Sequence, residues 1–275
     1  MELSLGFSPC PNDTYIFEAL VNKRIELNNY KFDLEISDVE KLNQQAFKNN
    51  LDITKLSFAA YAHVSENYQL LPYGSALGYK NGPLLISKKR IYPDEVPFLK
   101  IAVPGKYTTA KLLLGIFWPE AKQLKEYIFS EIEEVVISGE ADAGLIIHET
   151  RFTYQKKGLL KIADLGEMWE KQTSFPLPLG GIAIKRSLSE KVKNDIGQLI
   201  KNSLEFANRF PDASSDFIRK NAQETSDEIT KQHIQLYVNE YSLNLEEKGR
   251  KAVSYLLNKG FEKNIIPKVT EPVFI

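Results

Sequence analysis

The stretch from which the fold is best inferred is GEADAGLIIHETRF, residues 139–152. Small residues lead into the short apolar run Leu145-Ile146-Ile147, which ends abruptly at His148. A short run of branched apolar residues beside small residues is typical of a buried parallel strand. We therefore expect the imidazole of His148 at the carboxyl end of a strand, which is the end where open α/β sheets bind ligands.

The composition is ordinary for a globular protein. With 275 residues the chain exceeds the usual size of one domain, so two lobes are expected. Its 35 basic and 36 acidic residues give a formal net charge of −1, without the basic surface that nucleic-acid binding needs. No apolar run approaches the roughly 20 residues of a membrane helix, and the N-terminus lacks the pattern of a signal peptide. We expect a cytoplasmic protein without nucleic-acid or membrane partners.

The first part of the chain alternates apolar-patterned strands with helices, as α/β folds do. The expected strands span residues 2–7, 32–36, 51–56 and, after several glycine-containing turns, 83–86. The expected helices span residues 15–21, 39–47 and 58–64. Asn12, Asp13 or Thr14 is expected to cap the first of these helices.

A charged, proline-containing segment at residues 88–97 has the composition of a linker. Beyond it the pattern is repeated, with strands expected at residues 100–103, 145–147, 159–162 and 179–184. Residues 166–178, which include Trp169, are expected to form a long polar loop, and residues 189–260 are expected to be helical with breaks near Pro211 and Ser226.

These elements predict a two-lobed α/β architecture. Residues 1–95 and 186–275 would form the first lobe, and residues 96–185 would form an inserted second lobe. The chain would cross between the lobes at residues 88–99 and 178–186. A cleft between two lobes is the natural place for a ligand.

Two junctions of strand, polar loop and helix occupy corresponding places in the two lobes: Thr54-Lys55-Leu56-Ser57 and the segment from Gly105 to Ala110. Each offers a hydroxyl and the free N–H groups of a helix N-terminus, which together suit an anion such as a carboxylate. The alternative is that Ser57, Thr108 and Thr109 only cap their own helices. Neither segment contains a glycine motif for nucleotides.

His148 is the candidate for proton transfer, because imidazole titrates near neutral pH and this one ends a buried strand. The other two histidines, His63 and His233, lie in expected helices and are expected to be structural. The single cysteine, Cys10, excludes an internal disulfide and is expected to be an inert thiol. No second His or Cys lies at ligand spacing, so no metal site is expected.

Several motifs of this chain, in this order, resemble the 1,4-dihydroxy-6-naphthoate synthase family of the futalosine route to menaquinone. They are Ser8-Pro9-Cys10-Pro11-Asn12-Asp13-Thr14, Thr54-Lys55-Leu56-Ser57, Val103-Pro104-Gly105 with Thr108-Thr109-Ala110, Gly144-Leu145-Ile146-Ile147-His148-Glu149 and Pro176-Leu177-Pro178-Leu179-Gly180. The resemblance runs from end to end of the chain. The SPCPNDT opening favours this family over the related chorismate dehydratases.

The resemblance implies a periplasmic-binding-protein type II-like fold with a ligand cleft between its lobes. It also implies a lyase that converts cyclic dehypoxanthinyl futalosine to 1,4-dihydroxy-6-naphthoate and a sugar-derived fragment, without cofactor or metal. His148 would be the proton acceptor, and the substrate-binding residues would be Lys55, Leu56, Ser57, Thr109 and Ala110. Further candidates, placed near the cleft by the fold, are Asn12, Asp13, Asn43, Thr108, Leu179 and Gly180. No role follows for Glu149 or Arg151.

Two other functions remain open at this point. The related family dehydrates chorismate in the same pathway, and the same fold serves solute-binding proteins that capture small anions without catalysis. All three hypotheses give the chain a small anionic partner, which is a carboxylate for the two enzymes. The sequence leaves open whether the chain forms a homodimer.

Overall fold

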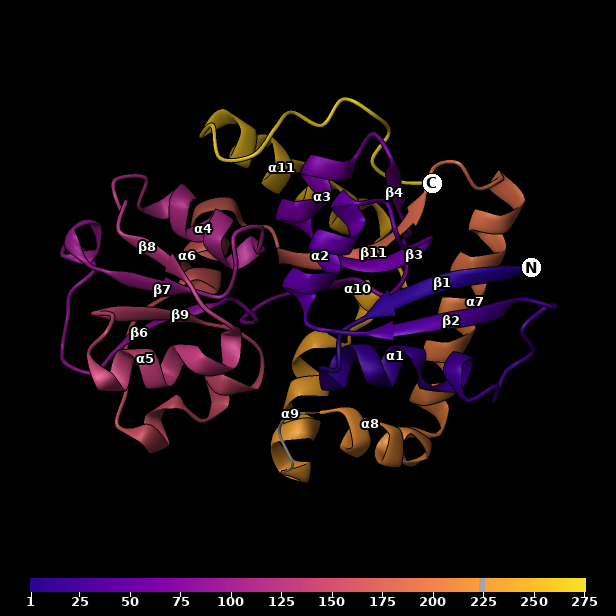
Figure 1. The fold of residues 1–275 in the computed structure, drawn as a ribbon, viewed down its shortest axis with the longest axis horizontal. Coiled ribbons are helices and arrows are strands. Elements are labelled where there is room, and N and C mark those ends of the chain that lie inside the picture. The colour runs from indigo at the N-terminus through magenta and orange to yellow at the C-terminus, as the bar shows by residue number, and fades with distance from the viewer. Residues whose placement is uncertain (223–225) are drawn as a thin grey trace.

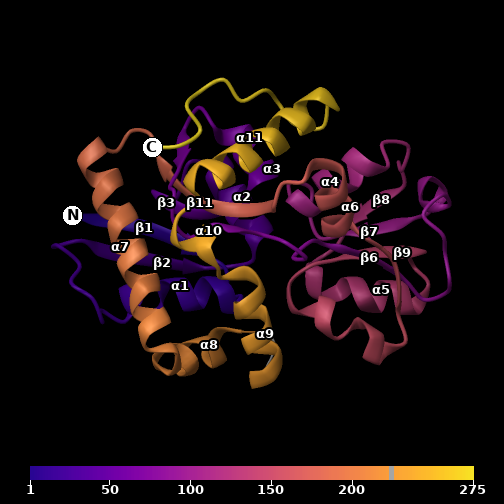
Figure 2. The ribbon, with the colours of Figure 1, turned by 180° about the vertical axis from the view of Figure 1, so that it is seen from behind.

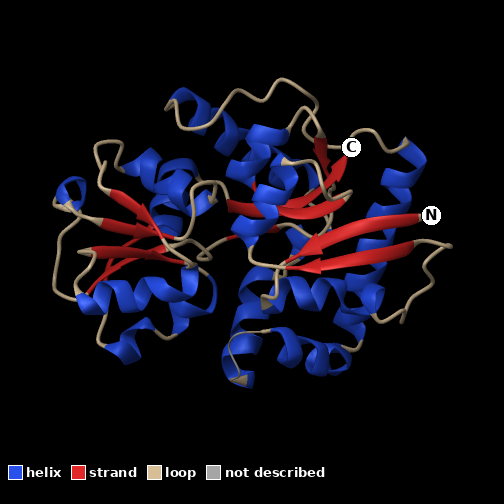
Figure 3. Cartoon of the chain, in the orientation of Figure 1, coloured by secondary structure: helices blue, strands red, loops and turns tan. Residues whose placement is uncertain are grey.

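The computed structural model describes residues 1–222 and 226–275 and contains two β-sheets, each flanked by helices (Figure 1, Figure 3). We refer to each sheet with its helices as a lobe. The two lobes lie side by side, and both chain termini lie on the first lobe (Figure 1). This arrangement confirms the predicted two-lobed α/β architecture.

The sheet of the first lobe consists of β1 (Glu2–Phe7), β2 (Lys31–Ile36), β3 (Ile53–Ser57), β4 (Tyr68–Leu70), β5 (Ala76–Gly78) and β11 (Leu177–Lys185). Its order is β2-β1-β3-β11-β4, and β5 also pairs with β11. Because β1 is parallel to both β2 and β3, the carboxyl ends of these strands lie at one edge of the sheet. β11 runs antiparallel to β3, β4 and β5.

The sheet of the second lobe consists of β6 (Leu84–Ser87), β7 (Ile101–Val103), β8 (Leu124–Glu126), β9 (Ala143–Ile146) and β10 (Leu160–Asp164), in the order β10-β6-β9-β7-β8. The strand expected before His148 is β9, and all of its residues are buried, as predicted. It is parallel to β7 but antiparallel to β6, so the parallel pairing that we expected holds on one side only.

The chain crosses between the lobes earlier than its linker-like composition predicted. β6 belongs to the second sheet, so the first crossing lies at residues 79–83 and not at residues 88–99. β11 belongs to the first sheet, so the return crossing lies at residues 174–176 and not at residues 178–186. The charged segment 88–97 was misleading because such a composition indicates exposure to solvent, and this segment is a connection within the second lobe.

Helices cover both faces of each sheet. They are α1 (Pro11–Val21), α2 (Val39–Phe47), α3 (Phe58–Val64), α7 (Glu190–Arg209), α8 (Ser215–Asn221), α9 (Asp227–Tyr237), α10 (Glu240–Leu243) and α11 (Glu246–Glu262) in the first lobe, and α4 (Thr109–Phe117), α5 (Ile132–Ser138) and α6 (Leu165–Thr173) in the second. α1 packs against α7, which lies behind the first sheet (Figure 2). Within residues 1–222 and 226–275, no helix combines the length and the apolar character needed to cross a membrane.

The first helix begins four residues earlier than expected. Cys10, and not Asn12, Asp13 or Thr14, is its N-cap residue, with extended dihedrals and no side-chain cap. The reason is Pro11, since a proline at the first helical position has no N–H to lose and is already set to a helical φ. As a consequence, Asn12 and Asp13 lie in the first turn of α1 and their side chains are free to make other contacts.

Residues 166–178 are not a long polar loop, because most of them form α6. Asp164 caps this helix by accepting hydrogen bonds from the backbone N–H groups of Gly166, at 2.9 Å, and Glu167, at 3.1 Å. Leu165 and Trp169 stand four residues apart on its buried face, and Trp169 packs edge-on against Tyr255 of α11. Trp169 is therefore a core residue.

Gly82, in the first crossing, lies directly against the backbone of α6. A Cβ atom at this position would lie 2.2 Å from the backbone nitrogen of Gly166. Since backbone cannot move aside as a flexible side chain can, we expect Gly82→Ala to destabilise the protein by about 1–3 kcal/mol. Thermal unfolding followed by circular dichroism should show a fall in Tm of roughly 2–4 °C for each kcal/mol.

Gly158→Asn is the matched control for this substitution. Gly158 has a φ of +75°, which asparagine tolerates, and a Cβ atom at this position would have no other atom within 4 Å. The control should unfold close to the wild-type temperature. Equal melting temperatures for Gly82→Ala and wild type would contradict the close approach of the crossing to α6.

Candidate active site

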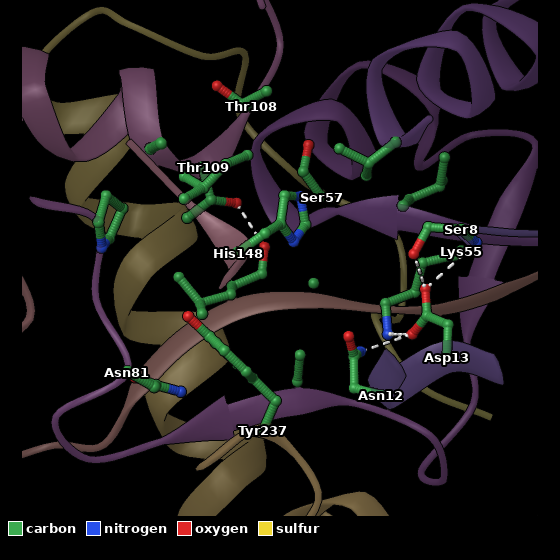
Figure 4. Close-up of a pocket in the computed structure, with 18 of the residues that line it drawn as sticks. Ser8, Asn12, Asp13, Lys55, Ser57, Asn81, Thr108, Thr109, His148 and Tyr237 are labelled. Carbon is green, nitrogen blue, oxygen red and sulfur yellow. Dashed lines mark hydrogen bonds and ion pairs between the residues drawn. The ribbon is translucent and has the colours of Figure 1, made fainter. Parts of the chain in front are cut away.

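A cavity lies between the lobes, next to the carboxyl ends of β1, β3, β7 and β9 (Figure 4). Most of the residues predicted from the sequence line it: Asn12, Asp13, Lys55, Leu56, Ser57, Thr108, Thr109, Ala110, His148, Leu179 and Gly180. The structure adds residues that were not predicted to belong to the site: Ser8, Val39, Ala76, Asn81, Pro83, Ile147, His233 and Tyr237. The structure therefore brings the two predicted junctions and His148 to one place.

A buried ion pair forms one wall of the cavity. Lys55, from β3, places its Nζ 2.7 Å from Oδ1 of Asp13, which lies in the first turn of α1. Nζ also donates to the carbonyl oxygen of Gly74 at 3.2 Å. The other carboxylate oxygen of Asp13 accepts a hydrogen bond from the Ser8 hydroxyl at 2.6 Å. The positive charge of Lys55 is thus compensated within the protein.

Ser57 is a helix cap and also a contact between the lobes. Its Oγ accepts a hydrogen bond from the N–H of Ala60, at 3.2 Å, and donates to the carbonyl oxygen of Tyr107 in the second lobe. Asn43 does not line the cavity. It lies behind Ser57, where its amide exchanges hydrogen bonds with the backbone N–H and the hydroxyl of Ser57. Asn43 therefore positions Ser57.

The N-termini of α3 and α4 meet across the cleft. Thr108 caps α4 by accepting from the N–H of Lys111 at 3.3 Å. Thr109 joins the lobes, because its Oγ1 accepts from the N–H of Ala59 at 3.3 Å and donates to the carbonyl oxygen of Leu179 at 2.7 Å. All three hydroxyls that we expected to bind an anion or cap a helix are thus engaged within the protein. The first-turn N–H groups of Thr109 and Ala110 have no partner inside their own helix.

His148 follows β9 and has a backbone conformation that residues other than glycine rarely adopt. Its φ is +58°, in the left-handed region, where histidine is tolerated better than branched residues. Its Nδ1 lies 3.3 Å from the sulfur of Cys10. Phe129 packs edge-on against the imidazole, with ring centroids 4.9 Å apart. The thiol and the aromatic ring hold the imidazole in one orientation at the cavity wall.

Cys10 has surroundings that the sequence did not reveal. Burial, and then the negative charge of Glu149, raise the pKa of its thiol well above the ordinary value, so the sulfur is a neutral S–H group. Cys10, His148 and Glu149 bring potential metal-ligating atoms within 4.8 Å of one another, although no such spacing exists in the sequence. A raised thiol pKa opposes metal binding, because the thiolate is the form that ligates. Among these three residues the thiol serves the imidazole as a hydrogen-bonding partner.

Arg151, which had no predicted role, is a structural residue. Its guanidinium donates to the carbonyl oxygen of Gly82 and lies 3.3 Å from a carboxylate oxygen of Asp164. It therefore connects the segment after β9 to the first crossing and to the cap of α6.

His233 was expected to be structural, yet it lines the cavity. Its Nε2 lies 2.9 Å from the side-chain oxygen of Asn12, and its ring is stacked on that of His148 with centroids 6.4 Å apart and planes at 11°. Burial lowers the pKa of its imidazole well below the usual value, and the neighbouring His148 lowers it further. Tyr237, one helical turn later in α9, also reaches the cavity. Their spacing of four residues, which places both on one helix face, was the signal in the sequence.

His63, by contrast, lies away from the cavity. Its ring packs edge-on against Tyr107, at 5.1 Å between centroids, and it is exposed to solvent. It therefore does not belong to the site.

The comparisons with known proteins agree with this geometry. Residues 3–262 match the model of a family described as menaquinone biosynthesis. The chain is 41% identical over 273 residues to a 1,4-dihydroxy-6-naphthoate synthase of Thermus thermophilus, covering 99% of each protein. It is 36% identical over 270 residues to the synthase of the same name from Streptomyces coelicolor, covering 96% of this chain and 95% of the relative.

Solved structures show the same fold. A crystal structure of a protein from Archaeoglobus fulgidus superimposes with a TM-score of 0.91 at 32% identity, covering 96% of this chain and 98% of the other. An alkanesulfonate-binding protein from Xanthomonas axonopodis, bound to MOPS, superimposes with a TM-score of 0.73 at 11% identity, covering 98% and 95%. The latter likeness concerns the fold alone and confirms the predicted periplasmic-binding-protein-like architecture. The matched family model and the two synthases show that this chain belongs to the menaquinone-biosynthesis family of 1,4-dihydroxy-6-naphthoate synthases.

Proposed function

We propose that this protein is a lyase that converts cyclic dehypoxanthinyl futalosine to 1,4-dihydroxy-6-naphthoate and a sugar-derived fragment. Its relatives carry the name of this synthase. The observation in the structure that best supports the proposal is the imidazole of His148 at the wall of a cavity between two lobes, beside two helix N-termini. The site combines a base with an anion-binding edge, which is what the elimination requires.

His148 acts as the proton acceptor in this proposal. It removes a proton from the sugar portion of the substrate, and the electron pair left on carbon then drives expulsion of the fragment. Aromatisation of the naphthalene ring supplies the driving force, so a modest base suffices and the proposed step uses no cofactor or metal. We assign the proton of the reactive tautomer to Nδ1, 3.3 Å from the sulfur of Cys10 as a weak acceptor, because Nε2 is then free to act as the basic atom.

The carboxylate of the substrate binds to the N-terminus of α4. The N–H groups of Thr109 and Ala110 are available there, and the helix dipole favours a negative charge. Leu179, whose carbonyl oxygen accepts from Thr109, lies beside this helix N-terminus and offers apolar surface to the ring system. Holding both parts of the substrate places the sugar against His148, and orientation of this kind contributes several kcal/mol to lowering a barrier, on the order of 7 or more in favourable cases.

Turnover of two candidate substrates distinguishes the proposed function from its alternatives. Purified protein is incubated with cyclic dehypoxanthinyl futalosine or with chorismate, and the products are separated by chromatography. We expect 1,4-dihydroxy-6-naphthoate from the first compound and no change in the second. Formation of a carboxyvinyl-benzoate from chorismate would assign the protein to the related activity, and binding without any product would make it an anion-binding protein.

The His148→Asn variant tests the proton acceptor. Asparagine keeps the polarity and tolerates the left-handed backbone at this position but lacks a basic nitrogen. We expect kcat to fall by about 100-fold or more, on the scale of general-base contributions, while calorimetry shows substrate binding within a few-fold of wild type. His63→Asn, a change at an exposed histidine outside the cavity, is the control and should keep full activity. A His148→Asn enzyme that turned over at the wild-type rate would place the base elsewhere.

Cys10→Ala and Cys10→Ser test the partner of the imidazole. Alanine leaves Nδ1 of His148 without a hydrogen-bonding partner, so the ring loses its preferred tautomer and orientation. We expect kcat to fall by about 10-fold or more in Cys10→Ala, since misplacement by about 1 Å already costs up to 100-fold. Serine restores a polar partner, and Cys10→Ser should recover part of the loss in steady-state assays. Equal rates for wild type and Cys10→Ala would show that the thiol does not position His148.

A further inference from the structure

We propose that His233 is a substrate-binding residue whose Nδ1 accepts a hydrogen bond from a hydroxyl of the sugar-derived part of the substrate. This inference rests on the proposed function and adds a second histidine to the site.

A chain of hydrogen bonds fixes the tautomer of His233. Asp13, whose carboxylate pairs with Lys55, accepts a hydrogen bond from Nδ2 of Asn12 at 2.8 Å. A carboxylate only accepts, so the orientation of the Asn12 amide is determined, and its oxygen must face Nε2 of His233 at 2.9 Å. An amide oxygen also only accepts. Nε2 of His233 therefore carries the proton.

The other ring nitrogen is left as an acceptor without a donor. Burial keeps the imidazole neutral by lowering its pKa, and a neutral imidazole carries one N–H. Nδ1 thus has a free lone pair. Within the residues that the structure describes, Nδ1 is buried and has no hydrogen-bonding partner. A buried polar atom without a partner is unfavourable, and at the wall of a ligand cavity a donor group of the ligand is a direct explanation for it.

The position of the ring identifies the part of the substrate that can reach it. His233 lines the same cavity as His148, and the two rings are stacked. Because His148 takes its proton from the sugar portion, that portion lies next to both imidazoles. A lone pair needs a donor, so the substrate carboxylate is not its partner, whereas a sugar hydroxyl is a suitable one.

The His233→Gln variant separates the two nitrogens. The glutamine amide nitrogen occupies the place of Nε2 and continues to donate to Asn12, but nothing replaces Nδ1. With cyclic dehypoxanthinyl futalosine we expect KM to rise by about 5- to 10-fold, the effect of losing one hydrogen bond between neutral groups, while kcat changes less than about 3-fold. The affinity for 1,4-dihydroxy-6-naphthoate, which lacks the sugar, should stay within about 2-fold of wild type. His63→Gln is the matched control and should leave KM unchanged.

The outcomes of this experiment are distinct. An unchanged KM in His233→Gln, or an equal loss of affinity for substrate and product, would overturn the assignment of Nδ1 to a sugar hydroxyl. A wild-type enzyme that fails to turn over the substrate would instead contradict the proposed function, whatever the variant does.

A measurement that leaves His233 unchanged covers the case in which His233→Gln does not fold. In ¹⁵N-histidine-labelled His148→Asn, only His63 and His233 contribute imidazole signals. We expect the Nδ1 resonance of His233 to shift towards its hydrogen-bonded position on addition of substrate, and to remain in place on addition of the naphthoate. A resonance that does not respond to the bound substrate would refute the hydrogen bond.

Discussion

The buried ion pair between Lys55 and Asp13 is the interaction on which the cavity depends. It joins β3 to the first turn of α1, and both side chains are almost completely buried. From Asp13 the hydrogen bonds continue to Ser8 on one side and to Asn12 and then His233 on the other. Removing one partner would leave an uncompensated charge, at a cost of about 3–5 kcal/mol. The pair thus determines the orientation of the Asn12 amide, and through this amide it determines the tautomer of His233, more than 200 residues later in the chain.

A second set of contacts holds the lobes together around the cavity. Ser57 donates to the backbone of Tyr107, Thr109 bridges Ala59 and Leu179, and the carboxylate of Glu40 accepts from the N–H of Tyr107 at 3.3 Å. The hydroxyls of Ser57 and Thr109, which we expected to bind the substrate, therefore hold the two lobes together. In the proposed function the anion therefore binds to backbone N–H groups, and the hydroxyls contribute by fixing where these groups point.

The sequence predicted those parts of the site that depend on local pattern. Lys55, Thr109 and His148 all stand at the carboxyl end of a strand or at the following helix, which strand periodicity alone can indicate. It did not predict the roles of Cys10 and His233, because these depend on which face of α1 meets the end of β9 and the face of α9. Such contacts join residues more than 100 positions apart, and the helical spacing of His233 and Tyr237 does not show what their face of α9 meets. The predicted lobe boundaries were wrong for a similar reason. The composition of residues 88–97 does not show that β6, which precedes them, pairs with β9 of the second lobe.

The charges of the cavity suggest why a solute-binding fold can serve a lyase. The fold is shared with an alkanesulfonate-binding protein at 11% identity, so it does not determine the chemistry. Among the residues that line the cavity, Lys55 and Asp13 carry opposite charges and neutralise each other, and the neutral ring of His233 adds none. In the proposed function the substrate carboxylate binds at a helix N-terminus, which positions it without a strong ion pair. A ligand that is bound without a strong ion pair dissociates more easily after it has reacted. An enzyme must release its product at each turnover, whereas a carrier must retain its solute.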